Sequence, residues 1–164
     1  MMADPVSVNV DGLEALLGRM DNISFDVRRK GGRFAMRKAA NIIRDKAQEN
    51  ATLLDDPASA ADISANIAIR FSPKDFKRNG NLVFRVGVLG GAGGRKTADQ
   101  LSGLPGQDTR HWRQQEFGNS RHPAQPFMRR ALSENIQAAT DEFISQYNKA
   151  LDRAIKRANK RAAR

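Results

Sequence analysis

The chain has 164 residues, of which 40% are hydrophobic and 6% aromatic, so we expect one domain with a modest core. It has no cysteine, which excludes disulfide bonds and thiolate chemistry, and no apolar run approaches the roughly 20 residues that cross a bilayer. The N-terminal sequence lacks the pattern of a signal peptide, so we expect the chain in the cytoplasm until it is assembled. Its net charge of +10 attracts polyanions, either nucleic acid or an acidic protein surface.

The first part of the chain predicts a strand and two helices. Residues 6–10 alternate between apolar and polar side chains, which is typical of a short half-buried strand. Asp11 can cap a helix that runs to about residue 20 with its leucines on one face. A second helix is predicted to start at Asp21-Asn22 or at Ser24 and to run to about Ala51. Gly31-Gly32 within it either kinks the helix or lets another backbone pack close.

A pair of antiparallel strands is the clearest β signal. Residues 52–62 have no clear period and are predicted to form a loop. Apolar residues then alternate with others in 64–72 and again in 82–88. Between these two runs, Asn79-Gly80 is a strong signal for the turn of a hairpin.

The segment 90–107 is rich in glycine, and we expect it to be mobile in the free protein and ordered only against a partner. Its start superficially resembles a phosphate-binding loop. Such a loop has glycine directly before its lysine, whereas here Arg95 precedes Lys96, so nucleotide binding is disfavoured. We interpret the segment as a basic arm that is either flexible or lies along a neighbouring subunit or DNA.

Residues 109–117 predict a weaker strand that holds two side chains of interest. Trp112 lies between Arg110 and Arg113 and could serve an interface, the core, or stacking on a nucleic-acid base. Glu116 could pair across a subunit contact with an arginine such as Arg129 or Arg130. The alternative is an ordinary intrachain ion pair.

A turn and a long helix complete the chain. Residues 118–120 favour a turn, and the helix is predicted from Pro126 to about Lys160. We divide the chain into a domain at 1–148 and a basic helical extension at 149–164. Cations fall on one side of the extension and alanine-rich apolar residues mostly on the other. The extension is either a solvated helix end or an arm that docks on an acidic ring surface or on DNA.

No catalytic or metal-binding pattern stands out. His111, Glu116 and His122 are the only residues that could begin a metal or acid–base cluster, and two lone histidines are a weak start for a site of three or four close ligands. We therefore expect no enzyme activity, no cofactor and no metal site.

Four motifs in order carry a family resemblance. They are VDGLEALLGRM, RKAANIIRDKAQENA, ISANIAI, and EFG followed by a short loop and PAQPFMRRAL, and they cover most of residues 8–150. This arrangement resembles a tail-completion family of lambda-like siphophages, whose members are small virion proteins of the head–tail neck. The predicted elements favour an α+β fold, with a small, mainly antiparallel sheet and helices packed on one of its faces.

The resemblance implies a structural protein that completes the tail and joins the tail tube to the DNA-filled head by ring assembly. Expected partners are other copies of the chain, neighbouring neck and tail proteins, and packaged DNA through phosphate contacts, with no membrane. Alternatives are a tail-terminator or head-closure ring protein, or a nucleic-acid-binding protein without sequence preference. The predicted subunit contacts are Trp112, Glu116, Phe117, Phe127, Arg129 and Arg130. The predicted contacts to a polyanion or a neighbouring ring are Arg95, Lys96, Lys156, Arg157, Lys160 and Arg161.

Overall fold

The computed structural model describes residues 25–54, 61–91 and 96–163, together with residues 12, 15, 16 and 18. The strand predicted at residues 6–10 lies outside the described residues. So does most of the first predicted helix, of which residues 15, 16 and 18 are helical. The chain forms two compact units, which are Met1–Ala39 with Ile136–Arg164 (unit 1) and Ala40–Asn135 (unit 2).

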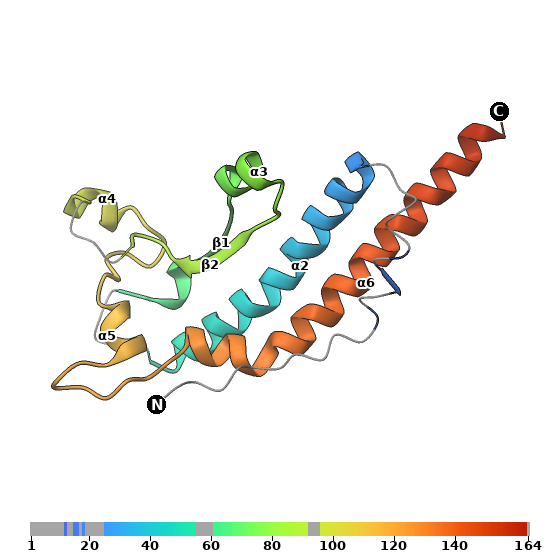
Figure 1. Ribbon diagram of the computed structural model, residues 1–164. Coiled ribbons are helices and arrows are strands. Elements are labelled where there is room, and N and C mark those ends of the chain that lie inside the picture. Colours follow the sequence, from blue (N-terminus) through green and yellow to red (C-terminus); the bar gives the residue numbers. More distant parts are fainter. Residues whose placement is uncertain are drawn as a thin grey trace. The chain divides into compact units, whose positions relative to one another are not determined.

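Two long helices contribute to both units (Figure 1). Helix α2, Phe25–Thr52, confirms the second predicted helix. Helix α6, Met128–Ala162, confirms the predicted final helix, although it begins at Met128 instead of Pro126. The predicted division at residue 148 stays a prediction, and α6 continues through that position as one helix.

Unit 2 holds the antiparallel pair that the sequence predicted. Strands β1, Ile67–Phe71, and β2, Phe84–Val88, form a two-stranded sheet in which Ile67 lies opposite Val88 and Phe71 opposite Phe84. A short 3-10 helix η1, Ser64–Asn66, occupies the start of the first predicted strand. Together with the helices, this sheet confirms the α+β class.

The expectation that Asn79-Gly80 forms a hairpin turn is wrong. The strands are joined through helix α3, Pro73–Asn79, and Gly80 ends it in the left-handed region at φ 72°. The N–H of Gly80 donates to the carbonyl of Phe76 at 2.9 Å, as at many helix C-termini. Pro73 suits a first helical turn. The Asn-Gly pair therefore correctly indicates a left-handed residue, but Gly80 is the cap of a helix and not part of a hairpin turn.

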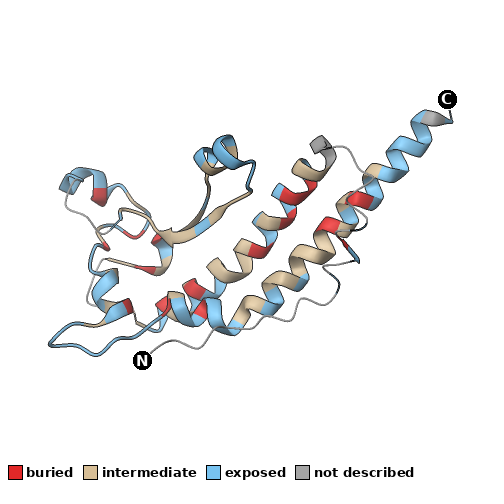
Figure 2. Ribbon diagram, viewed as in Figure 1, coloured by how far each residue is buried: buried red, intermediate tan, exposed pale blue. Residues whose placement is uncertain are grey.

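One face of the sheet is buried in the core of unit 2. The register puts Ile67, Val86 and Val88 on one face and Arg70 and Arg85 on the other. The apolar face packs on the end of α2 and the start of α6, as predicted for a sheet covered on one side, and Figure 2 shows buried positions on both helices there. The buried core residues are Ala47, Ala51, Ile63, Ile67, Phe127 and Ala131.

The described part of the segment 90–107, which is residues 90, 91 and 96–107, is not an arm that awaits a partner. Its described part contains helix α4, Ala98–Ser102, whose start is closed by a capping box between Thr97 and Gln100. Leu101 is 0% exposed, whereas the side chains of an arm that is ordered only by a partner would be exposed in the free chain. The capping box and the buried leucine order this part within the chain. Arg95 lies outside the described residues.

Asn66 ties this segment to the start of β1. Its buried side-chain amide donates to the carbonyl of Gln107 at 2.9 Å and to Oγ1 of Thr109 at 2.8 Å, and its Oδ1 accepts from the N–H of Gly106 at 2.9 Å. These bonds satisfy polar groups that would otherwise be buried without partners. Removing residues 90–107 would break this network, so we expect the deletion to unfold unit 2.

The strand predicted at residues 109–117 is also wrong. Residues Trp112–Phe117 form helix α5. The segment contains no β-branched residue after Thr109, and glutamine, glutamate and arginine are good helix formers. Trp112 packs against the core of unit 2 and Glu116 is buried. Two inward residues spaced by four are the pattern of a helix and not the alternation of a strand.

In unit 1, the first part of α2 and the second part of α6 run side by side (Figure 1). Their core consists of Leu16, Ala35, Tyr147 and Leu151. The hydroxyl of Tyr147 donates to the carbonyl of Arg28 at 2.8 Å, and burial raises the pKa of Tyr147 above its ordinary value. The phenol is therefore held as a neutral donor.

Gly31 is where the two helices approach closely. A Cβ atom there would lie 3.1 Å from Cβ of Ala150 and 3.1 Å from Cε2 of Tyr147. Helix α2 continues through Gly31-Gly32 as one element. Of the two roles predicted for this pair, a kink or close packing, close packing is the one that Gly31 has.

We predict that Gly106→Ala destabilises the protein by about 3 kcal/mol or more. A Cβ at Gly106 would lie 1.8 Å from the carbonyl oxygen of Asp62, and backbone cannot move aside cheaply. Gly103→Ala is the matched control, because a Cβ there meets nothing closer than 3.7 Å. Urea unfolding followed by circular dichroism measures both, and equal midpoints for the two variants would contradict the close approach.

Candidate functional site

Helix α6 begins without a capping residue of its own. Residues 125–127 include no Ser, Thr, Asp or Asn that could accept from its first N–H groups. The carboxylate of Glu116 takes this role from an earlier helix. Its Oε2 accepts from the N–H groups of Phe127 and Met128, both at 2.8 Å, and its Oε1 accepts from the N–H of Arg129 at 3.0 Å.

The side chain of Arg129 completes this arrangement. Its Nε lies 3.1 Å from Oε1 of Glu116, and its Nη2 donates to the carbonyl of Glu116 at 2.6 Å. Glu116 is only 1% exposed. A buried charge is stable only when it is paired and hydrogen-bonded, and here a guanidinium and the positive end of a helix surround the carboxylate.

The turn between α5 and α6 is built by the residues that suggested it. Gly118 has φ 73°, and a Cβ there would lie 2.7 Å from the backbone nitrogen of Ala124, so glycine is required. Oδ1 of Asn119 accepts from the N–H groups of Arg121 and His122 at 2.8 and 2.9 Å. The motif therefore places Glu116 under the first turn of α6.

The predicted contact residues divide into buried and exposed sets. Of the two roles predicted for Glu116, the structure contains the intrachain ion pair, with Arg129 as the partner. Phe127 is 1% exposed and belongs to the core, and Trp112 is half-buried, with Nε1 donating to the carbonyl of Gly91 at 3.3 Å. Phe117, Arg129 and Arg130 are exposed, and their role in subunit contacts stays a prediction.

Three exposed side chains are linked to this ion pair by contact or by their position on α6. The guanidinium carbon of Arg129 lies 5.0 Å from the ring centroid of Phe117, a cation–π contact. Leu132 follows three residues later, which makes it a neighbour of Arg129 on the helix surface. Phe117 is 59% exposed and Leu132 is 51% exposed. We call Phe117, Arg129 and Leu132 the assembly patch, of which sequence reasoning had missed Leu132.

The predicted polyanion contacts lie apart in the chain. Lys156, Arg157, Lys160 and Arg161 are all exposed at the end of α6 in unit 1, and Lys96 is exposed in unit 2. Lys30 and Arg153 were outside the predicted set, but they line the same groove of unit 1 as Arg157 and Arg161. Lys30 could not have been found from sequence, since only packing brings α2 beside the end of α6.

Among the described residues, neither a metal site nor a membrane-spanning helix is found. His111 and His122 are exposed, and in the parts of the chain that the structure describes, no three histidine or carboxylate side chains are grouped to hold a metal ion. Over the same residues, no helix combines the length and the apolar character that spanning a bilayer requires.

We predict that Glu116→Gln destabilises the protein by about 2–4 kcal/mol, because the amide nitrogen would face N–H donors and the charge would be lost. Glu134→Gln is the control, since this exposed carboxylate pairs with Arg130 at 2.8 Å on the helix surface and should change stability by less than about 0.5 kcal/mol. The free energy of unfolding in urea measures both. Equal small effects would show that the buried carboxylate contributes no more than a surface one.

Comparison with models of known protein families gives a match. The family model HK97-gp10-like, described as "Bacteriophage HK97-gp10, putative tail-component", matches residues 14–118. No curated protein and no solved structure was found to match the chain. The matched range is more than half of the chain, and it ends directly after Glu116 and Phe117. The chain therefore belongs to the HK97-gp10-like family of bacteriophage tail components, which confirms the resemblance found in its sequence.

Proposed function

We propose that this chain is a structural virion protein of the phage neck, which completes the tail and joins the tail tube to the DNA-filled head by assembling into a ring. It catalyses no reaction in this role. Membership of a family of phage tail components supports a place in the virion. The finer assignment to the neck is supported by the motifs that resemble tail-completion proteins.

The main support for assembly into a ring is the assembly patch. Exposed aromatic residues and arginines are enriched among the residues that dominate protein interfaces. In this chain, Glu116 holds Arg129 in place at the face of the Phe117 ring, so the patch is ordered before any partner arrives. Preorganisation of this kind lowers the entropic cost of association.

The small sheet supplies a second argument. Among the described residues, β1 and β2 pair only with each other, so each strand has one edge that no further strand covers. Open edges of this kind are available for pairing with another chain. A two-stranded sheet in unit 2 is therefore consistent with copies that complete one another in a ring.

We predict that Phe117→Ser and Leu132→Ser each weaken self-association by about 30-fold, which corresponds to loss of about 2 kcal/mol at an interface centre. Leu53→Ser is the matched control, because Leu53 is 80% exposed in the same unit and lies outside the patch. Sedimentation velocity measures the oligomers, and circular dichroism confirms that each variant is folded. If both patch variants assemble like the unmodified chain, the patch is not the subunit contact.

The place in the virion is tested by reconstitution. Tails from a phage that lacks this protein should fail to join filled heads, and purified protein should restore joining. The Leu53→Ser variant should restore it and Phe117→Ser should not. Co-purification with the portal complex alone would instead identify a head-closure protein, and normal joining without the protein would contradict a role in the neck.

A further inference from the structure

A positively charged groove runs along unit 1 between α2 and the end of α6. Its volume is about 640 Å³. Four of its lining residues are cationic and none is acidic. The lining residues are Lys30, Gly31, Phe34, Ala150, Arg153, Ala154, Arg157, Ala158 and Arg161.

The cations of this groove are not neutralised by carboxylates in the part of the chain that the structure describes. Nε of Arg153 donates to the carbonyl of Lys149 at 3.0 Å, and Nε of Arg157 donates to the carbonyl of Arg153 at 3.1 Å. These bonds lay the two side chains along the helix surface. Neither Lys30 nor Arg161 takes part in an ion pair within the described residues. As far as the described residues go, the positive charge of the groove is therefore uncompensated.

The arginines follow a spacing that suits a phosphate backbone. Arg153, Arg157 and Arg161 are four residues apart, so successive guanidiniums are separated by about 6 Å along the helix axis. One strand of duplex DNA carries a phosphate about every 3.4 Å of its axis, so the row spans several phosphates. The planar guanidinium also binds phosphate oxygens in pairs, which a lysine cannot do.

The floor of the groove favours a phosphate backbone over a protein helix. It consists of Gly31, Ala150, Ala154 and Ala158, with Phe34 as its one bulky side chain. An amphipathic helix that docks in a groove needs deep apolar pockets for its anchor residues. A floor of small residues offers no such pockets, but it lets a sugar–phosphate backbone approach the guanidiniums closely.

We propose that this groove binds the sugar–phosphate backbone of duplex DNA, without sequence preference. The DNA it would meet in the virion follows from the proposed place in the neck, whereas the binding itself depends only on the groove. Phe34, which is 44% exposed, would cover a deoxyribose face. Lys156 and Lys160 would add to the local field without lining the groove.

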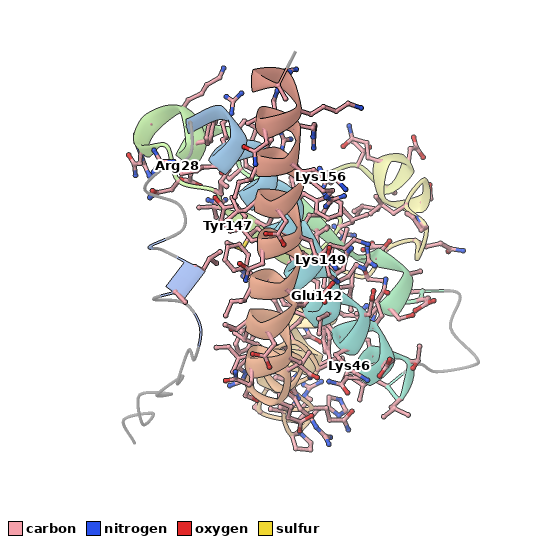
Figure 3. The ribbon with its side chains drawn as sticks, turned by 90° about the vertical axis from the view of Figure 1, so that its right-hand side faces the viewer. Arg28, Lys46, Glu142, Tyr147, Lys149 and Lys156 are labelled. Carbon is pink, nitrogen blue, oxygen red and sulfur yellow. The ribbon has the colours of Figure 1, made fainter. Side chains whose placement is uncertain are left out.

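A control surface lies on the same helix. Figure 3 shows Lys149 and Lys156 on the side of α6 turned away from Tyr147, and neither residue lines the groove. Both are exposed. Replacing these two lysines removes as much charge from α6 as replacing two groove arginines, so the pair separates a defined site from the general positive field of the helix.

The experiment measures binding of the full chain to a short DNA duplex by fluorescence anisotropy, between about 50 and about 200 mM salt. Arg153→Gln with Arg157→Gln should weaken binding by about tenfold or more and reduce the salt slope by about two phosphate contacts. Lys149→Gln with Lys156→Gln should weaken it by less than about threefold. Circular dichroism confirms that both variants are folded.

Equal losses in the two double variants would overturn the groove as the site, and so would an unmodified chain that does not bind the duplex. Binding of a poly-glutamate peptide in place of DNA would assign the groove to an acidic protein. The Phe117→Ser variant should bind DNA like the unmodified chain. If the unmodified chain binds the duplex but forms no ring, only the proposed function is contradicted. If it forms a ring but does not bind the duplex, only the groove proposal is contradicted.

Discussion

Unit 2 depends on the hydrogen bonds and the ion pair that the buried carboxylate of Glu116 makes. A helix start without a local cap needs acceptors for its free N–H groups, and a buried carboxylate needs positive partners. Each requirement meets the other, because the carboxylate accepts from three consecutive N–H groups and from Arg129. The result places Phe127 in the core and Arg129 over Phe117.

The two units use charge in opposite ways. In unit 2 the buried charge has its partners within the chain, so it belongs to the fold and specifies where α6 starts. In unit 1 the arginines of the groove have no carboxylate to pair with among the described residues, and they are available to an outside anion. A net charge of +10 does not by itself distinguish these uses. Burial and the presence of partners do.

At three segments, the sequence analysis identified the properties of the residues correctly but predicted the wrong local structure. Gly80 does adopt the left-handed conformation, but it caps helix α3 and does not form a hairpin turn. Residues 109–117 do carry inward side chains, but at helical spacing. The glycine-rich segment 90–107 has few apolar residues, yet one buried leucine and the amide of Asn66 suffice to order its described part. In the glycine-rich segment, contacts with the distant Asn66 outweighed the local pattern, whereas α3 and α5 follow from local helix signals.

The sequence by itself determined the α+β class, the antiparallel pair, both long helices and the phage family, because periodicity and ordered motifs are properties of neighbouring residues. Only the tertiary structure decided that Glu116 caps α6, that Arg129 lies over the ring of Phe117, and that Lys30 shares a groove with Arg153. The physical reason is that these arrangements join residues from different helices. Side chains brought together by packing leave no periodic signal along the chain.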